Sequence, residues 1–513
     1  MKKIKNKEKI GLHPVMFLLI LCLIIIVLSG ILSFFNVQAT YSKVSSITGD
    51  YQVTTESVTS LFSLSGLKYI FTSTVSNFAN FAVLSNLIII LLGIGIMVKS
   101  GFLKTIIILL TKKAKKTTVT FALVLICILS SIIGDLSYVI FIPLAALLFL
   151  YGKRNPMIGI ITAFASLTCG NGISLFLTSV DSSLLTMTLS NAHIIDNAYS
   201  ISPWAYIFVM FLLIIGLSLL LTNISENYIA KKVPKYEFPE DELEDELVLT
   251  KRKMRGLIWA FTFGFVYLLI FIYNIIPGLP FSGNLLDYSQ TYYIDKLFSY
   301  NSFFSNGFIF IVAVLFVIWG LCYGIGAKTI TNNKEFIEAL GYSLNGIGKI
   351  IVMIFAASIF INIFKYSNIG NVITAAFTNL VTHSNFSALP LILLLFVVVA
   401  ISSLFLPNAL NSWQIFSSAV PSLMSVGISP EFSQLVFRLG NSLTIGLTPV
   451  FAYFIIYVAF LANYNQSKKS LTIGEAIKFQ IPYVVISFLF FLSFIIVWYV
   501  IGLPLGVGAS VAP

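Results

Sequence analysis

The chain has 513 residues, of which 58% are hydrophobic and only 10% are charged. Soluble domains carry about 25% charged residues, so this composition excludes an ordinary soluble protein and favours a polytopic α-helical membrane protein. The net charge of +11 lies in short loops that alternate along the chain. This is the positive-inside pattern, so the basic character gives no reason to expect a nucleic-acid partner.

The N-terminal segment is a lysine-rich stretch followed by an apolar run over residues 15–35. A signal peptide with a cleavage site after Ala39 is one interpretation. The apolar run, however, is longer than a typical h-region of roughly 7–15 residues. We therefore predict a retained first helix over 14–35, with the N-terminus in the cytoplasm because lysines favour that side.

Charge and hydropathy predict the remaining spans in chain order. The polar segment 36–80 and the loop 181–203 are expected outside. Uninterrupted spanning helices are expected over 82–98, 204–225, 256–276, 305–325, 345–365 and 480–502, and helices with an internal break over 156–180 and 431–462. The segments 118–150 and 388–425 are candidate re-entrant hairpins. Two short helices joined by a tight turn are the alternative for the first, because charge places its ends on one side in either case.

The predicted fold is therefore an all-α polytopic membrane protein with about nine transmembrane helices and two re-entrant hairpins. We divide the chain into an N-terminal helix and external segment (1–80), a first repeat unit with hairpin 118–150 (81–228), an acidic cytoplasmic loop with scaffold helices (229–344), a second repeat unit with hairpin 388–425 (345–503) and a C-terminal tail (504–513).

An internal repeat relates the two broken helices. Residues 167–179 read LTCGNGISLFLTS and residues 437–449 read FRLGNSLTIGLTP, so that Gly170, Asn171 and Ser174 match Gly440, Asn441 and Thr444. A helix break exposed to lipid would leave backbone amides unpaired, at a cost of several kcal/mol each. The two units begin on opposite sides of the membrane, so they are inverted repeats with broken helices. Such repeats are typical of secondary transporters with a site near the midplane.

Six stretches carry a resemblance to a known family. They are 13–21 (HPVMFLLIL), 77–101 (NFANFAVLSNLIIILLGIGIMVKSG), 134–146 (GDLSYVIFIPLAA), 322–326 (CYGIG), 437–449 and 502–506 (GLPLG). On these residues the chain resembles the AbgT family of transporters, named for p-aminobenzoyl-glutamate transport. The resemblance implies a homodimer, a scaffold, and a transport core of hairpins and broken helices. It also implies ion-coupled symport or antiport of folate-related aromatic carboxylates, or efflux of sulfonamide-like antimetabolites.

The resemblance also assigns family positions to individual residues. These are Asp135 at the first hairpin tip, Asp181 after the first broken helix, Trp413 at the second tip, and Arg438 and Pro449 around the second break. Two positions depart from the family, which usually has Asp where this chain has Asn441 and Lys where it has Ser412. Both changes remove a charge from the expected site, so a different small organic anion or a peptide-like solute is an alternative substrate.

Arg438 is the strongest substrate-binding candidate, because an unpaired charge in an apolar segment costs at least about 2.5–3.5 kcal/mol. Its planar guanidinium suits bidentate recognition of a carboxylate. An ion pair with Asp135 or Asp181, or snorkelling to the outside, is the alternative. Trp413 could stack on an aromatic substrate or serve only in packing. The full predicted substrate-binding set is Arg438, Trp413, Asn441, Asn408, Asn411, Ser412 and Pro449.

Neutral oxygens near the two breaks suggest a cation site. Hard cations such as Na⁺ take oxygen ligands, including the carbonyls freed at helix breaks. The alternative is that the amides only cap the broken helix ends. Asp181 is expected to act as a gate or proton site, or to be an ordinary helix-end residue. The predicted ion-coupling set is Asp135, Asn171, Gly170, Ser174, Asp181 and Thr444. Na⁺ is expected ahead of H⁺, because Asn441 removes one candidate proton carrier.

Two other classes of protein are less consistent with the sequence. A membrane enzyme would need a Ser-His pairing, a metal-ligand spacing or an acidic cluster, and none stands out. A channel would need a tandem selectivity motif or a charged ring. We therefore predict a non-enzymatic carrier in the cell membrane. Its expected partners are a small organic anion, the lipid bilayer and a second copy of itself, and it needs no cofactor beyond the coupling ion, Na⁺ or H⁺.

Overall fold

The computed structural model describes residues 11–44, 51–175, 177–202, 204–238, 249–299, 301–467 and 469–513. Eight helices in these ranges are long and apolar enough to cross a membrane. The chain begins with α1 (Pro14–Phe34), an antiparallel pair of β1 (Gln38–Val44) and β2 (Tyr51–Ser57), α2 (Leu64–Ala79), α3 (Ala82–Lys99) and α4 (Phe102–Thr111). The all-α membrane fold is confirmed, with this short ribbon as an addition.

The predicted first repeat unit, 81–228, begins with α3 and α4 and contains the first hairpin and the first broken helix. These consist of α5 (Lys116–Leu129), a 3₁₀ turn (Ser130–Ile133), α6 (Leu136–Tyr151), α7 (Pro156–Cys169) and α8 (Ser179–Ala192). The next elements are α9 (Ile207–Ile224), α10 (Ala230–Lys232), α12 (Lys251–Ile275), α13 (Tyr293–Phe298), α14 (Phe303–Ala327) and α15 (Asn333–Gly341).

The predicted second repeat unit, 345–503, likewise contains a hairpin followed by a broken helix. It comprises α16 (Gly348–Ser367), α17 (Ile369–Thr382), α18 (Ala388–Ser402), α19 (Ala409–Phe416), α20 (Val420–Ser425), α21 (Pro430–Thr444) and α22 (Phe454–Tyr464), and α23 (Ile473–Ile501) closes the chain. Both broken helices begin alike, with a polar N-cap and a proline in the first turn: Asn155-Pro156 for α7 and Ser429-Pro430 for α21. Proline is favoured there because its missing N–H has no helical partner in any case.

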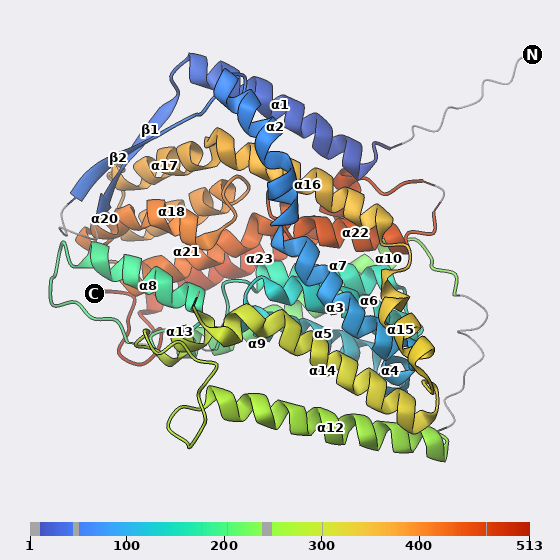
Figure 1. Ribbon diagram of the computed structural model, residues 1–513. Coiled ribbons are helices and arrows are strands. Elements are labelled where there is room, and N and C mark those ends of the chain that lie inside the picture. Colours follow the sequence, from blue (N-terminus) through green and yellow to red (C-terminus); the bar gives the residue numbers. More distant parts are fainter. Residues whose placement is uncertain are drawn as a thin grey trace, which may run out of the picture.

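The broken helices form the centre of the molecule. Every residue of α7 is buried, as is every residue of α21 except the last. By contrast, only 22% of the most apolar window of α1, α12 and α23 is buried. Figure 1 shows α12 along one edge and α1 along the opposite edge, with α7, α21 and α22 between them. The long apolar helices thus provide lipid-facing surface, while the interrupted helices are enclosed by protein, as unpaired backbone groups require.

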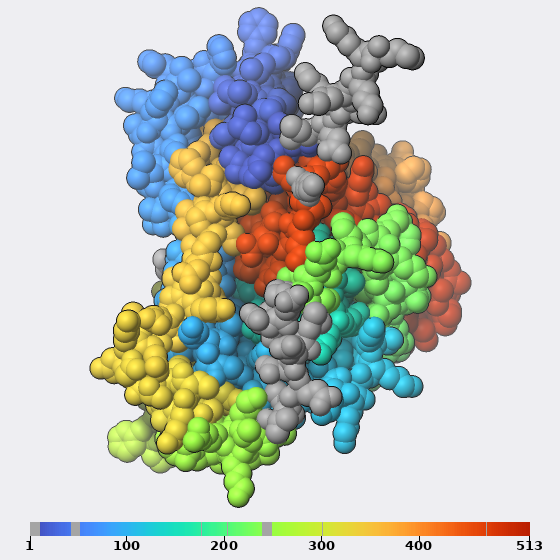
Figure 2. All heavy atoms as spheres, turned by 90° about the vertical axis from the view of Figure 1, so that its right-hand side faces the viewer, coloured from blue at the N-terminus to red at the C-terminus, as the bar shows by residue number. Residues whose placement is uncertain are grey.

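The lysine-rich segments gather at one end of the structure. The end of α10, the start of α12 and α15 all lie at the right-hand side of Figure 1, whereas α8, α13 and the β1–β2 ribbon lie at the left. Figure 2, viewed from that right-hand side, shows green and yellow segments from the middle of the chain beside red segments from its end. This arrangement agrees with the sides predicted from charge, since segments expected on one side of the membrane lie together.

Three parts of the sequence form regular structure that polarity alone did not predict. The segment 36–80 contains the β1–β2 ribbon and α2, the loop 181–203 contains most of α8, and α17 precedes the second hairpin. In the ribbon, Tyr41 packs against Ala375 and Ile415, so a polar strand covers α17 and α19. Paired strands satisfy their own backbone hydrogen bonds without a continuous apolar run, which is why hydropathy misses them.

The second helix break lies later than predicted. The first begins at Gly170, where α7 ends, but α21 continues through Gly440 and Asn441. A Cβ on Gly440 would lie 2.9 Å from a backbone oxygen of α18, so this glycine serves close helix packing and the helix remains intact. The break spans 445–453 and contains Thr448-Pro449. A proline lacks an N–H and disfavours helical geometry at the residue before it, which explains the position.

Candidate functional site

A cavity of about 550 Å³ lies where the two hairpin tips and the two helix breaks meet. Its polar lining comes from five parts of the chain: Ser131, Asp135, Asn171, Thr178, Lys365, Asn368, Asn371, Asn408, Asn411 and Arg438. Its apolar lining includes the aromatic rings of Phe364, Phe405 and Phe451. Small-molecule sites have this size and this mixture of apolar walls with few polar groups.

The first hairpin tip presents Asp135 to this cavity. Gly134 adopts a left-handed φ of +58°, which turns the chain between the 3₁₀ segment and α6. Ser131 donates a hydrogen bond of 2.8 Å to the carbonyl of Ile173 in the first helix break. This bond joins the tip to the break, so Asp135 and the unwound segment occupy fixed positions on one wall of the cavity.

The two breaks contact each other's helices reciprocally. A Cβ on Gly172 would lie 2.7 Å from the backbone oxygen of Arg438, and a Cβ on Gly446 would lie 2.9 Å from the hydroxyl of Thr168. Thr168 and Arg438 occupy equivalent positions in the internal repeat. Each break therefore passes close to the helix of the other unit at a glycine, although the two glycines are not equivalent in the repeat.

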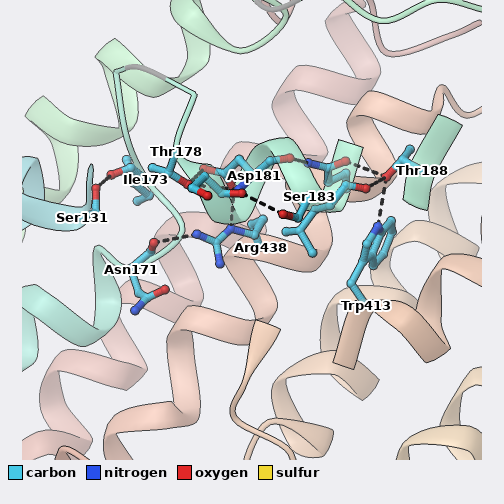
Figure 3. A network of polar contacts seen from close by, with 12 residues as sticks. Ser131, Asn171, Ile173, Thr178, Asp181, Ser183, Thr188, Trp413 and Arg438 are labelled. Carbon is cyan, nitrogen blue, oxygen red and sulfur yellow. Dashed lines mark hydrogen bonds and ion pairs between the residues drawn. The ribbon is translucent and has the colours of Figure 1, made fainter. Parts of the chain in front are cut away.

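Arg438 forms a buried ion pair with Asp181. Its Nε lies 2.9 Å from Asp181 Oδ1, and its Nη2 donates a 2.8 Å hydrogen bond to the carbonyl of Asn171 (Figure 3). Thr178 caps α8 by accepting from the Asp181 amide at 3.1 Å, which places Asp181 in the first turn, where the helix dipole favours an acid. Nη1 is buried and bonds no described residue. The sequence analysis considered an ion pair of Arg438 with Asp135 or Asp181, or snorkelling to the outside. The structure contains the ion pair with Asp181.

Asn441 connects α21 to the second hairpin tip. Its Nδ2 donates to Ser403 Oγ at 2.9 Å and to the Pro407 carbonyl at 3.3 Å, and the residue is buried. An aspartate here would present only acceptors to that carbonyl, so the amide suits the position. Thr444 likewise donates to the Ala400 carbonyl of α18. These side chains fasten the tip, and neither lines the cavity.

Trp413 lies outside the cavity, in the packing between three helices. Its side chain is fully buried, its ring centroid lies 4.5 Å from that of Phe437, and its Nε1 donates a 3.0 Å hydrogen bond to Thr188 Oγ1. Thr188 in turn donates to Gln434 at 2.6 Å, so α19, α8 and α21 are joined through one network (Figure 3). Stacking of Trp413 on a substrate ring stays a prediction that requires this network to open.

We expect Trp413→Phe to lower stability but not ligand affinity. The substitution keeps an aromatic ring and removes the indole N–H, so the loss is one buried hydrogen bond, on the order of 1 kcal/mol. Thermal unfolding in detergent should show a lower midpoint, while the Kd for a bound ligand should change less than about twofold. A large increase in Kd at unchanged stability would instead assign the ring to substrate stacking.

The remaining predicted residues divide between the cavity and its surroundings. Asn408 and Asn411 line the cavity, and the Asn408 side chain caps α19 by accepting from the Asn411 amide at 3.0 Å. Ser412 is fully buried behind them. The other predicted positions outside the cavity lining are Gly170, Ser174 and Pro449, of which Ser174 borders a separate small pocket beside Asp181. Their predicted roles in substrate or ion binding stay predictions.

Several cavity residues were missed by the sequence analysis. Lys365 lies in the last turn of α16, and Asn368 and Asn371 follow it at the start of α17. Asn368 adopts a left-handed φ of +60°, which allows the chain to turn from one helix into the next. Lys365 is the last residue of the predicted helix 345–365, where a lysine ordinarily reaches water, so its position alone gave no signal of a site.

Comparisons with known proteins find relatives along almost the whole chain. The model of the AbgT putative transporter family matches residues 4–512. The p-aminobenzoyl-glutamate transport protein of Escherichia coli (strain K12) is 25% identical over 497 residues, which cover 97% of this chain and 94% of that protein. The chain is thus a multi-pass membrane transporter. It belongs to the AbgT family.

Two solved structures are also similar. The Alcanivorax borkumensis YdaH transporter is 27% identical with a TM-score of 0.47, covering 96% of this chain and 100% of that one. MtrF of Neisseria gonorrhoeae, described as illuminating a class of antimetabolite efflux pumps, is 27% identical with a TM-score of 0.48, covering 97% of each chain.

Proposed function

We propose that this chain is an ion-coupled secondary transporter of p-aminobenzoyl-glutamate or related folate-type aromatic carboxylates, or an exporter of sulfonamide-like antimetabolites. The observation that carries the proposal is Arg438, which lines the cavity with a buried guanidinium whose Nη1 bonds no described residue. A buried donor without a partner costs about 1–3 kcal/mol, and an arriving carboxylate would recover that energy. The aromatic walls would hold the ring of the substrate.

The Arg438–Asp181 pair suggests how binding is linked to movement. Asp181 belongs to α8, on the far side of the first break, whereas Arg438 belongs to α21. A substrate carboxylate that binds the guanidinium competes with Asp181 and weakens the link between the two repeat units. A ligand can bias a conformational change only through such a difference in contacts between states.

The coupling ion in this proposal is Na⁺, with H⁺ as the second candidate. Asp135 offers a carboxylate to the cavity, and Ser131, Asn171 and Thr178 add neutral oxygens beside it. The carbonyl of Asn171 already accepts from Arg438, so its side chain is the more available ligand. We further propose that the protein is a homodimer of the cell membrane with its N-terminus in the cytoplasm. Either direction of transport is compatible with this site.

The test is flux of labelled p-aminobenzoyl-glutamate into proteoliposomes under imposed Na⁺ and H⁺ gradients, applied separately. We expect accumulation driven by the Na⁺ gradient and abolished when that gradient is collapsed. Accumulation that ignores Na⁺ and follows a pH gradient would assign H⁺ instead. Absence of both flux and binding in folded protein would overturn the substrate assignment and favour another small organic anion or a peptide-like solute.

A further inference from the structure

We propose that Lys365 is a second carboxylate-binding residue of the cavity, so that an aromatic dicarboxylate contacts both Arg438 and Lys365. Both side chains line the same cavity but come from different helices, α21 and α16. This inference rests on the proposed function, and it adds a binding residue to that site.

Lys365 has no partner of its own in the described residues. Its side chain is exposed to the cavity and forms no ion pair or hydrogen bond there. Glu56, the acid connected to this region through β2, accepts a 2.8 Å hydrogen bond from Asn368. The other polar groups that follow Lys365, the amides of Asn368 and Asn371, bond to each other at 2.8 Å and carry no charge. Within the part of the chain that the structure describes, the ammonium group therefore lacks a compensating anion.

The charges around the cavity differ in how they are compensated. Arg438 forms an ion pair with Asp181 at 2.9 Å, whereas Lys365 has no ion-pair partner among the described residues. Asp135 is the one acid among the described cavity-lining residues, and it forms no ion pair with Lys365. A substrate with two carboxylates would satisfy the ammonium of Lys365 and the remaining donor of Arg438. Asp135 would then remain available for the coupling cation, which a carboxylate favours.

The cavity that Arg438 and Lys365 line also offers apolar contacts for an aromatic body. Phe364 precedes Lys365 on α16, Phe451 follows the second break, and Phe405 lies at the second hairpin tip. Aromatic walls hold a planar ring by stacking or edge-to-face contact. The cavity therefore combines aromatic walls with cations from separate helices, as an aromatic dicarboxylate requires.

The test compares three ligands and four proteins by equilibrium binding in detergent. The ligands are p-aminobenzoyl-glutamate and the two amides in which either its α- or its side-chain carboxylate is replaced, p-aminobenzoyl-isoglutamine and p-aminobenzoyl-glutamine. The proteins are the native chain, Lys365→Met, Lys365→Arg and the control Lys349→Met, an exposed lysine at the other end of α16. Thermal unfolding checks that each variant is folded.

We expect Lys365→Met to raise the Kd for p-aminobenzoyl-glutamate about tenfold or more, as loss of a charge-assisted contact does. One of the two amides should bind the native chain weakly and be insensitive to Lys365→Met, because it lacks the carboxylate that Lys365 contacts. Lys365→Arg keeps the positive charge, so its Kd for the dicarboxylate should be close to that of the native chain. Lys349→Met should leave every Kd unchanged.

Two outcomes would overturn the inference. If Lys365→Met leaves all three Kd values unchanged, Lys365 binds no carboxylate. If it raises all three equally, its effect is general and not directed at one carboxylate. Failure of the native chain to bind p-aminobenzoyl-glutamate would overturn the proposed function itself, and with it this inference, so the two failures are distinguishable.

Discussion

Arg438→Lys is expected to reduce transport by at least tenfold while leaving the fold intact. The guanidinium of Arg438 reaches Asp181 with one nitrogen and the Asn171 carbonyl with another, at 2.9 Å and 2.8 Å. A lysine ammonium is a single point and cannot span both partners and a substrate carboxylate as the planar fork does. Each lost contact to a charged group costs about 1.5–3 kcal/mol, which corresponds to at least a tenfold loss of affinity. Flux in proteoliposomes and thermal unfolding measure the two effects separately.

The matched control for this substitution is Arg154→Lys. Arg154 Nη2 forms an ion pair of 2.6 Å with Glu226, and both side chains are mostly buried, but neither residue lines the cavity. The control should lower stability without a specific loss of ligand affinity. Transport by Arg438→Lys at the native rate would show that Arg438 has only a structural role and would remove it from the site.

Gly172→Ala is expected to impair transport severely and to destabilise the protein. The added Cβ would lie 2.7 Å from the backbone oxygen of Arg438, and a backbone atom cannot move aside as a flexible side chain can. Overpacking of this kind typically costs about 1–3 kcal/mol. Here it would also displace the first break from α21 and so disturb the Arg438–Asn171 bond. Ligand binding and the unfolding midpoint should both fall.

Gly474→Ala is the control for the glycine substitution. Gly474 lies in the first turn of α23, and a Cβ there would meet nothing within 4 Å. Alanine in a helix is favoured over glycine, so this variant should be as stable as the native chain or slightly more so. Native transport by Gly172→Ala would mean that the first break moves away from α21 at this point during function, which the close contact with Arg438 argues against.

The internal repeat illustrates what a sequence can and cannot locate. The match of Gly170 with Gly440 predicted two related helix breaks, and there are two. The first begins at Gly170, but the second begins after Gly440, because α18 packs against that glycine and the helix survives until Thr448-Pro449. A glycine permits a break or a close contact equally well, and only its neighbours in space decide between them.

In the candidate site, too, the sequence predicts some features and leaves others to the tertiary structure. Arg438, Asp135 and Asn171 could be selected from the sequence, since charged and amide residues within apolar segments are expensive unless they serve a purpose. The sequence offered both Asp135 and Asp181 as ion-pair partners of Arg438 but could not choose between them, because the pair with Asp181 joins residues more than 250 positions apart through two broken helices. Lys365 was missed because it lies at a helix end, where a lysine ordinarily reaches water.

The sequence by itself determined the class of this protein. Long apolar runs, alternating lysine-rich loops and the repeated Gly-Asn segments each follow from the cost of placing charges and unpaired amides in lipid, a cost that acts locally along the chain. Only the tertiary structure decided which residues face the cavity. That choice depends on close approaches, such as Gly172 on Arg438 and Trp413 on Phe437, that are set by packing between distant segments and leave no periodic signal in the chain.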